Sequence, residues 1–322
     1  MRTRPLGRTG LMVSELGFGA WGIGGKQWLG SDDQASLAAL HQGFESGINI
    51  VDTALAYGEG HSEKIVGRSL KDHPGVAVAT KIPPKNHVWP ANASMPVREC
   101  YPPEYVVACC EESLRNLGVE RIDLLQLHTW HDAFLEQDSS WRPAFESLKK
   151  TGKVRLLGIS VSEHEPGTAL RAAQAGFVDA MQVLYNIYDP RAGSELFPLC
   201  VKKGIGVLAR VPFDEGGLTG SITAETAFEE GDFRAGYFRG DRKEQVVEHA
   251  RALQGLLGSE ARTLPELALR FCLSHEAVST VIPGMRRLSS VRGNAEAAGR
   301  GPLPPGLLKT LEGHAWPRNF YQ

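Results

Sequence analysis

Residues 49–58 read Asn-Ile-Val-Asp-Thr-Ala-Leu-Ala-Tyr-Gly, and this stretch decides the fold. It continues from Ile48 as an apolar, β-branched run, which is typical of a buried strand. The strand ends at Asp52, and Tyr57 follows in the loop just beyond it. Because ligands bind at the carboxyl ends of strands in a parallel sheet, we expect both side chains to face a binding site.

Strand-like and helical patterns alternate on both sides of this stretch. Strands are predicted at 16–18, 48–51, 76–80, 122–127, 154–159, 180–184, 207–209 and 278–282. Helices are predicted at 32–46, 62–70, 104–117, 141–150, 167–175, 194–203, 264–273 and 288–297, with a further one at 242–257. Strands that alternate with helices of this length imply parallel pairing and right-handed crossovers. Eight such units predict an α/β fold, a (β/α)8 TIM barrel, as a single domain over residues 1–322.

An open, doubly wound sheet is the alternative fold. Such a sheet usually carries a glycine-rich nucleotide-binding turn after its first strand, and residues 17–22 lack the complete spacing. Alternation around a Thr-Gly turn at 5–14 predicts an N-terminal β-hairpin. Two connections, 82–103 and 212–240, are too long for simple loops. Both follow strands, so we expect them to overhang the C-terminal face and cover a substrate or cofactor.

Composition limits the classes of partner and compartment. The 322 residues include 35 Lys and Arg against 37 Asp and Glu, a net charge of −2, so neither nucleic acid nor an anionic membrane is expected as a partner. The first residues contain no apolar leader segment, which predicts a cytoplasmic protein. The five cysteines show no C-x-x-C pair and no zinc-site spacing, so we expect reduced thiols and no metal.

Four polar side chains are predicted to meet at one end of the barrel. Strand two ends at Asp52, strand three at Lys81 and strand four at His128, while Tyr57 lies in the loop after strand two. Each alone has an ordinary structural explanation: a cap, a first solvated residue, a satisfied histidine or a loop tyrosine. Their shared position at successive strand ends favours a common site instead.

These four side chains could act together in one proton transfer. A phenol has a reference pKa of about 10 and is a poor proton donor at neutral pH. A neighbouring ammonium lowers that pKa, and a buried carboxylate keeps the lysine charged. An imidazole beside the phenol can hold a carbonyl oxygen. The set therefore predicts a site that protonates an oxyanion as it forms.

The chain resembles the aldo-keto reductase family. The resemblance rests on Asp-Thr-Ala-x-x-Tyr-Gly at 52–58, Ile-Asp-Leu-Leu-Gln-Leu-His at 122–128 and Gly-Ile-Ser at 158–160. It extends from Leu-Gly-Arg-Thr-Gly at 6–10 to Val-Ile-Pro-Gly at 281–284. It implies NADPH-dependent hydride transfer to a small-molecule aldehyde or ketone by an enzyme that is a monomer or a weak homo-oligomer. Tyr57 would be the general acid, tuned by Lys81 and Asp52, with His128 positioning the carbonyl.

The resemblance also implies a set of cofactor contacts: Gly19, Trp21, Ser160, Gln182, Arg210, Pro212, Gly284, Arg286, Arg287 and Asn294. The chain departs from the family pattern at Val161, where an asparagine often stands, and at Gly293, where an acidic residue is frequent. Arg210 stands where an aromatic residue often stacks on the nicotinamide. An arginine plane can stack too, but its charge is unfavourable beside the oxidised ring, so Arg210 could turn to the diphosphate.

Two neighbouring arginines indicate the form of the cofactor. Arg286 and Arg287 precede the last predicted helix, and both guanidinium groups and helix N-termini favour phosphate. We therefore expect NADPH in preference to NADH. The alternative is that both side chains are simply solvated at the start of a helix.

Three tryptophans are candidates for the substrate pocket. Trp21 matches an aromatic residue that lines the pocket in many relatives, Trp130 follows His128 closely, and Trp89 or Tyr101 could close over from the long loop. Core packing or loop anchoring is the competing explanation for each. An aromatic wall would favour an apolar or aryl carbonyl, or a sugar stacked on a ring.

Two other functions compete with the reductase. A cofactor-binding regulatory subunit could keep the same four residues and turn over slowly. A hydrolase or isomerase on the same barrel would want paired catalytic acids or metal ligands, which are not evident in the sequence.

Overall fold

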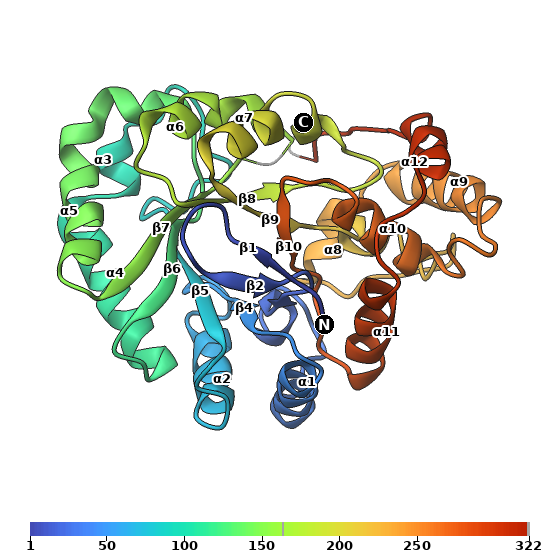
Figure 1. The fold of residues 1–322 in the computed structure, drawn as a ribbon, viewed down its shortest axis with the longest axis horizontal. Helices are drawn as coiled ribbons and strands as arrows, with labels where there is room; N and C mark the ends of the chain where they lie inside the picture. The colour runs from blue at the N-terminus through green and yellow to red at the C-terminus, as the bar shows by residue number, and fades with distance from the viewer. Residues whose placement is uncertain (163, 321–322) are drawn as a thin grey trace.

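A closed barrel of eight parallel strands forms the centre of the molecule (Figure 1). The computed structural model describes residues 1–162 and 164–320. The strand order is β10-β9-β8-β7-β6-β5-β4-β3, and parallel bridges from Leu16 to Val281 and from Gly19 to Gly284 join the last strand to the first. The strands are β3 (Phe18–Gly19), β4 (Ile50–Asp52), β5 (Ala77–Ile82), β6 (Ile122–Leu127), β7 (Val154–Ser160), β8 (Ala180–Leu184), β9 (Gly206–Arg210) and β10 (Val278–Val281). The predicted barrel is confirmed.

Helices surround the barrel at the predicted positions. The helices that follow the strands are α1 (Asp33–Glu45), α2 (His61–Leu70), α4 (Pro103–Leu117), α5 (Asp138–Lys150), α6 (Leu170–Ala175), α7 (Leu196–Lys203), α10 (Leu264–Leu273) and α11 (Leu288–Gly299). The helix predicted from 242 is α9 (Arg242–Gln254). Three helices were not predicted from the sequence: the short α3 (Val97–Cys100) and α8 (Phe233–Tyr237), and also α12 (Pro305–Glu312). Proline and glycine interrupt the apolar period in each region.

Local signals explain where the helices begin and end. The Asp32 carboxylate accepts a hydrogen bond from the Ala35 backbone N–H, and Thr263 does the same for Glu266, so both are N-caps. Gly118, Gly176 and Gly204 end α4, α6 and α7 in the left-handed conformation that glycine adopts without strain. These boundaries set the loop lengths at both ends of the barrel.

The predicted N-terminal hairpin is confirmed and closes one end of the barrel. Strands β1 (Thr3–Pro5) and β2 (Met12–Ser14) pair antiparallel, and Leu6 enters the barrel interior. Leu6 lies so close to Gly206 that a Cβ there would be 2.5 Å from Leu6 Cδ1. The buried apolar cluster that contains Leu6 and extends into the barrel interior consists of Leu6, Val13, Ile50, Ala77, Ala79, Leu124, Leu156, Ala180, Leu208 and Ile282.

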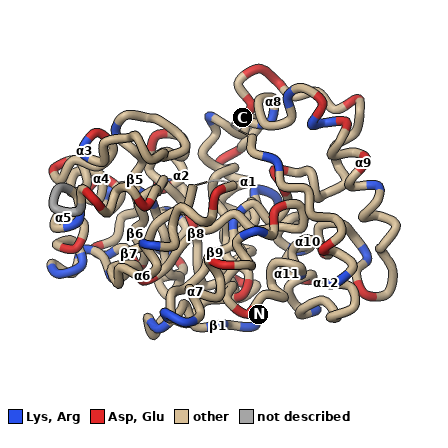
Figure 2. The backbone as a smooth tube through the Cα atoms, turned by 90° about the horizontal axis from the view of Figure 1, so that it is seen from above, with Lys and Arg blue, Asp and Glu red and all other residues tan. Residues whose placement is uncertain are grey.

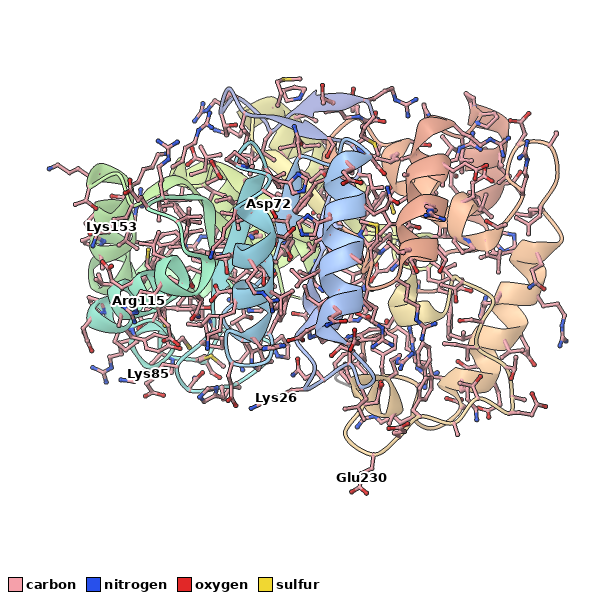
Figure 3. The ribbon with its side chains drawn as sticks, turned by 90° about the horizontal axis from the view of Figure 1, so that it is seen from below. Lys26, Asp72, Lys85, Arg115, Lys153 and Glu230 are labelled. Carbon is pink, nitrogen blue, oxygen red and sulfur yellow. The ribbon has the colours of Figure 1, made fainter. Side chains whose placement is uncertain are left out.

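The two long connections lie at the opposite end of the barrel. Figure 3 shows the labelled Lys26, Lys85 and Glu230 along one edge of the molecule and the β1–β2 hairpin along the other edge. Lys and Arg are interspersed with Asp and Glu along the chain (Figure 2). Among the residues that the structure describes, no helix is both long and apolar enough to cross a membrane.

Replacing Leu6 with alanine is expected to destabilise the protein by roughly 2–5 kcal/mol, because a fully buried leucine leaves a cavity inside the barrel. Met12→Ala on the same hairpin is the control, since Met12 is 49% exposed and should cost less than about 0.5 kcal/mol. Urea unfolding of both variants measures the difference. Equal losses of unfolding free energy in the two variants would show that Leu6 does not fill the barrel interior.

Candidate active site

The ammonium of Lys81 organises the polar end of the barrel. Lys81 is fully buried at the end of β5, and its Nζ donates to Asp52 Oδ2 at 2.6 Å, to the Thr53 carbonyl at 2.8 Å and to the Tyr57 hydroxyl at 3.1 Å. An ammonium has three N–H donors, and each has an acceptor here. Burial lowers the pKa of Lys81, while the Asp52 carboxylate opposes that shift.

Asp52 accepts hydrogen bonds on both carboxylate oxygens. Lys81 bonds to Oδ2, while the side-chain amides of Gln182 and Gln126 lie 2.7 Å and 3.4 Å from Oδ1. Gln126 was not predicted as a site residue. A signal was present, because Gln126 lies two residues before His128 and strand residues two apart face the same side. The carboxylate therefore accepts hydrogen bonds from residues on three other strands, β5, β6 and β8.

A close contact between two loops places Tyr57. Gly58 has a φ of +64°, and a Cβ at this position would lie 2.0 Å from the Gly24 carbonyl oxygen. Gly24 is equally crowded, because its Cβ would lie 2.9 Å from the Tyr57 carbonyl carbon. Only glycine allows these backbones to meet. The contact holds Tyr57 between the end of β4 and the turn η1 (Trp21–Ile23).

His128 lies beside Tyr57 as a neutral imidazole. The two ring centroids are 5.5 Å apart in an edge-on arrangement. Burial, followed by the charges of Lys81 and Arg210, holds the pKa of His128 well below its usual value of 6.5. Among the described residues, its Nδ1 has no hydrogen-bond partner. A neutral imidazole carries one N–H, which can donate a hydrogen bond to a bound molecule.

A cavity of about 1260 Å³ opens beside these residues. Asp52, Tyr57 and His128 line it, while Lys81 lies beneath. The predicted cofactor residues that line it are Gly19, Trp21, Ser160, Gln182, Arg210, Pro212, Gly284, Arg286 and Asn294. Among the described residues, Arg287 is exposed at the start of α11 and is not part of the lining. The structure therefore separates Arg287 from its neighbour Arg286.

The predicted substrate residues divide into two groups. Trp21 stacks on Tyr57 with 6.0 Å between ring centroids, and Trp89 meets His128 edge-on at 4.7 Å. Both line the cavity. The prediction for Trp130 is corrected, because this fully buried ring packs in the core against Phe134, Trp141 and Phe177. Tyr101 is also buried, and its hydroxyl bonds to the Thr129 backbone.

Two loops meet across the cavity, which the sequence did not predict. The Phe233 backbone N–H donates to the Gln27 carbonyl at 2.9 Å, and the Phe233 ring contacts Trp21 edge-on at 4.9 Å. Arg234 lies 4.6 Å from the Trp28 ring centroid. All of these residues line the cavity, so residues 21–28 and 233–234 form part of its wall.

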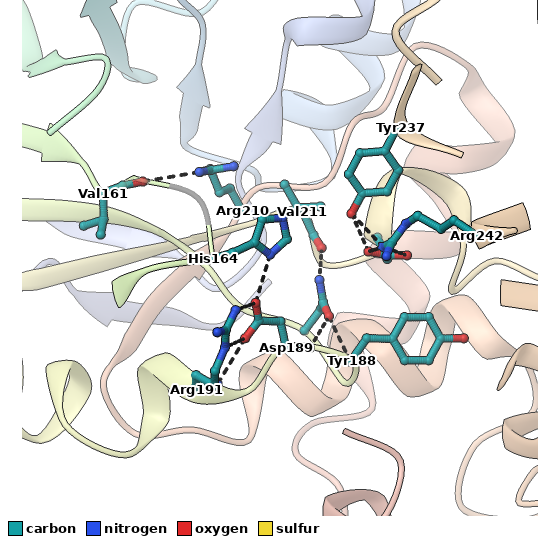
Figure 4. A network of polar contacts seen from close by, with 11 residues as sticks. Val161, His164, Tyr188, Asp189, Arg191, Arg210, Val211, Tyr237 and Arg242 are labelled. Atoms are coloured by element: carbon teal, nitrogen blue, oxygen red, sulfur yellow. Dashed lines mark hydrogen bonds and ion pairs between the residues drawn. The ribbon is translucent and has the colours of Figure 1, made fainter. Parts of the chain in front are cut away.

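A buried ion pair anchors the second of these loops (Figure 4). Asp214 accepts hydrogen bonds from Arg242 at 3.0 Å and from the Tyr237 hydroxyl at 2.6 Å. The three side chains are nearly inaccessible to solvent. Asn186 supports the start of the same loop by donating to the Val211 carbonyl at 2.9 Å. These contacts anchor the 212–240 connection beside the cavity, where it was predicted to cover a substrate or cofactor.

The cavity fits a nicotinamide dinucleotide. It extends from Tyr57 to the start of α11, where Gly284 and Gly293 line it with open space at their Cβ positions. Arg286 supplies a cation at that end. Among the described residues, the buried Nδ2 of Asn294 has no hydrogen-bond partner, as expected of a donor that meets a ligand. The opposite end holds the amide and hydroxyl groups of Gln182 and Ser160.

Comparison with known proteins agrees with this geometry. The family model described as Aldo/keto reductase family matches residues 15–315. The NADH-specific methylglyoxal reductase of Escherichia coli (strain K12) is 31% identical over 312 residues, covering 92% of this chain and 93% of that protein. The glycerol dehydrogenase AKR11B4 from Gluconobacter oxydans superposes with a TM-score of 0.80 at 28% identity, covering 97% and 94% of the two chains. The holo form of AKR11C1 from Bacillus halodurans gives 0.77 at 29% identity, covering 98% and 96%.

The low pKa of His128 predicts a pH dependence of stability. Below pH 6.5 the unfolded chain binds a proton that the folded imidazole does not, so this residue makes stability fall as pH decreases, by at most about 1.4 kcal/mol per pH unit. Urea unfolding between pH 7.5 and 5.5 should show a smaller loss for His128→Gln than for wild type. His87→Gln, at an exposed site, is the control and should keep the wild-type slope. If the unfolding free energies of wild type and His128→Gln changed equally with pH, the folded state would not be suppressing protonation of His128.

Proposed function

Because the chain belongs to the aldo/keto reductase family, we propose that it reduces an aldehyde or ketone with NADPH, with Tyr57 as the general acid. Members of this family are oxidoreductases that act on carbonyl and alcohol groups with nicotinamide cofactors, and the chain is such an enzyme. The choice of NADPH and the individual residue roles are the proposal.

The contact between Lys81 and Tyr57 carries the proposed role of Tyr57. The phenol oxygen accepts a hydrogen bond from the ammonium at 3.1 Å, so its own O–H remains a donor. Proton loss from Tyr57 leaves a phenolate next to a cation, which stabilises it. Asp52 holds that cation in place at 2.6 Å. Tyr57 can therefore deliver a proton to an oxygen atom on which negative charge is developing.

His128 and the aromatic wall would orient the carbonyl. A neutral imidazole carries one N–H, which can donate to the same oxygen atom that Tyr57 protonates. Trp21 and Trp89 flank the two residues and would exclude water from the reacting carbon. The substrate class that fits this wall is an apolar, aryl or sugar-like carbonyl compound.

Ser160 and Gln182 would hold the nicotinamide end of the cofactor, which supplies the hydride when it is bound. The hydrogen bond of Gln182 to Asp52 supports one form of this proposed contact. Its amide nitrogen donates to Asp52 at 2.7 Å, so its carbonyl oxygen is the atom left to accept from a carboxamide. Gln182 would thus connect the cofactor to the catalytic carboxylate.

Arg286 supports NADPH over NADH. It lines the cavity, and its Nη1 donates to the Leu29 carbonyl at 2.6 Å, which fixes the guanidinium at the α11 end. Burial, followed by the neighbouring charges of Arg234 and Arg287, lowers the pKa of Arg286, and a phosphate bound beside Arg286 would favour its charged guanidinium. The Escherichia coli relative is named as NADH-specific, so the preference needs its own test.

A regulatory subunit with little turnover is the other function considered. The relatives with named activities are reductases and dehydrogenases, which does not favour it. Loss of NADPH absorbance with a panel of aldehydes discriminates between the two functions, because tight binding without turnover would support the regulatory role.

Replacing Tyr57 with phenylalanine is expected to reduce kcat by orders of magnitude while leaving the Kd for NADPH nearly unchanged, because only the proton donor is lost. Steady-state rates and fluorescence titration measure the two quantities. Trp89→Phe is a matched control at the cavity mouth and should change KM more than kcat. A near-normal kcat for Tyr57→Phe would exclude this residue as the acid.

Replacing Arg286 with glutamine is expected to weaken NADPH binding about tenfold and leave NADH binding nearly unchanged, because NADH lacks the 2′-phosphate. Arg287→Gln removes an exposed neighbouring charge outside the cavity and is the control. Titration of all three proteins with both nucleotides tests this. A similar loss for NADH would place Arg286 at the diphosphate instead.

A further inference from the structure

Val211 has a backbone conformation that the local sequence does not favour. Its φ is +57°, in the left-handed region that a β-branched residue rarely adopts. Pro212 follows it, and a proline favours an extended conformation in the residue before it. Because both residue types oppose this conformation, contacts with the rest of the chain have to hold it.

This strained residue sets the path of one cavity wall. The strand β9 ends at Arg210, and the chain turns at Val211. The Asp214 backbone N–H closes the turn by donating to the Val211 carbonyl at 3.1 Å. The residues of this segment that line the cavity are Val211, Pro212, Phe213, Glu215 and Gly216. A different φ at Val211 would send the segment in another direction and change the shape of the cavity.

The side chain of Asn186 holds the Val211 carbonyl. Asn186 is 1% exposed, and its Nδ2 donates to that carbonyl at 2.9 Å (Figure 4). Its Oδ1 accepts hydrogen bonds from the backbone N–H groups of Tyr188 and Asp189, both at 2.9 Å. These two accepted bonds determine that the amide nitrogen faces Val211. Among the described residues, Asn186 is not part of the cavity lining.

The loop that carries Asn186 is itself anchored. Asp189 accepts a hydrogen bond from Arg191 Nη2 at 2.7 Å, and His164 Nδ1 lies 3.0 Å from Asp189 Oδ2. Asp189 is buried, so these contacts tie the loop to neighbouring parts of the barrel end. Asn186 therefore reaches the Val211 carbonyl from a fixed position.

We propose that Asn186 is a positioning residue for the dinucleotide: it holds Val211 in the left-handed conformation and so keeps residues 211–216 in the arrangement that binds the cofactor. The proposal rests on the proposed function, because it requires the cavity to hold a nicotinamide dinucleotide. In this role Asn186 acts through the Val211 backbone and not by touching the cofactor. It favours the binding-competent conformation over one in which Val211 relaxes, so its loss weakens binding.

Glycine at position 211 provides the decisive comparison. Glycine adopts a positive φ without strain, so the turn in Val211→Gly should no longer need Asn186. Val211→Ala also removes most of the side chain from the cavity, but its Cβ keeps the left-handed conformation unfavourable. The two variants therefore separate backbone strain from the space that a smaller side chain leaves.

The test measures the Kd for NADPH by fluorescence titration, with and without Asn186→Asp, in three backgrounds: wild type, Val211→Ala and Val211→Gly. Aspartate keeps an oxygen acceptor for the Tyr188 and Asp189 N–H groups but has no donor for the Val211 carbonyl. We expect Asn186→Asp to weaken NADPH binding about tenfold in the wild-type background and at least about fivefold in Val211→Ala. In Val211→Gly the loss should be less than about twofold.

Two further variants control for charge and for general damage to the loop. Asn186→Ser is neutral, and its hydroxyl can bond to the same N–H groups but is too short to reach Val211. It should reproduce the pattern of Asn186→Asp, and it replaces that variant if the aspartate does not fold. Tyr188→Phe removes a hydroxyl that has no hydrogen-bond partner among the described residues, so it should keep the wild-type Kd. Circular dichroism and urea unfolding verify the fold of each protein.

Three results would overturn the inference while leaving the proposed function intact. The first is an unchanged NADPH Kd in the folded Asn186 variants, even if their stability to urea falls, because Asn186 would then be purely structural. The second is an equal loss in the Val211→Gly background, and the third is an equal rescue by Val211→Ala. If the wild-type protein bound neither NADPH nor NADH, the proposed function itself would fail, and the inference with it.

Discussion

A buried ion pair between Lys81 and Asp52 governs the functional end of this barrel. Removing two charges from water costs several kcal/mol per ion, and the cost is recovered only when the remaining donors and acceptors are satisfied. Here they are, since the ammonium has three acceptors and the carboxylate accepts from Lys81, Gln182 and Gln126. The pair links the ends of β4, β5, β6 and β8. The pair also orients the Tyr57 hydroxyl, which accepts a hydrogen bond from Lys81.

The two ends of the barrel interior have different roles, one in stability and the other in the chemistry of the site. One end is filled by an apolar cluster in which Leu6, from the hairpin, closes the bottom. The other end carries the ion pair, its amide partners and the cavity. This is the division expected of parallel barrels, because the loops that follow the strands all emerge at the carboxyl end. The buried apolar layer beneath the ion pair supports the geometry of the polar layer.

The loops above the barrel determine the shape of the cavity. Residues 21–28 and 233–234 meet through a backbone hydrogen bond, an aromatic pair and an arginine over Trp28. The buried ion pair between Asp214 and Arg242 anchors the loop that contains residues 233–234. Both Arg286, close to the start of α11, and Arg210, at the end of β9, line the same cavity.

The sequence by itself determined the eight strand–helix units and the convergence of Asp52, Tyr57, Lys81 and His128. These follow from periods of two and 3.6 residues and from strand ends that share one face. Only the tertiary structure decided which aromatic rings reach the cavity: Trp89 does, while Trp130 turns into the core. It alone separated Arg286 from Arg287 and joined Phe233 to Gln27. The physical reason is that loop direction depends on contacts between distant segments, which no local period encodes.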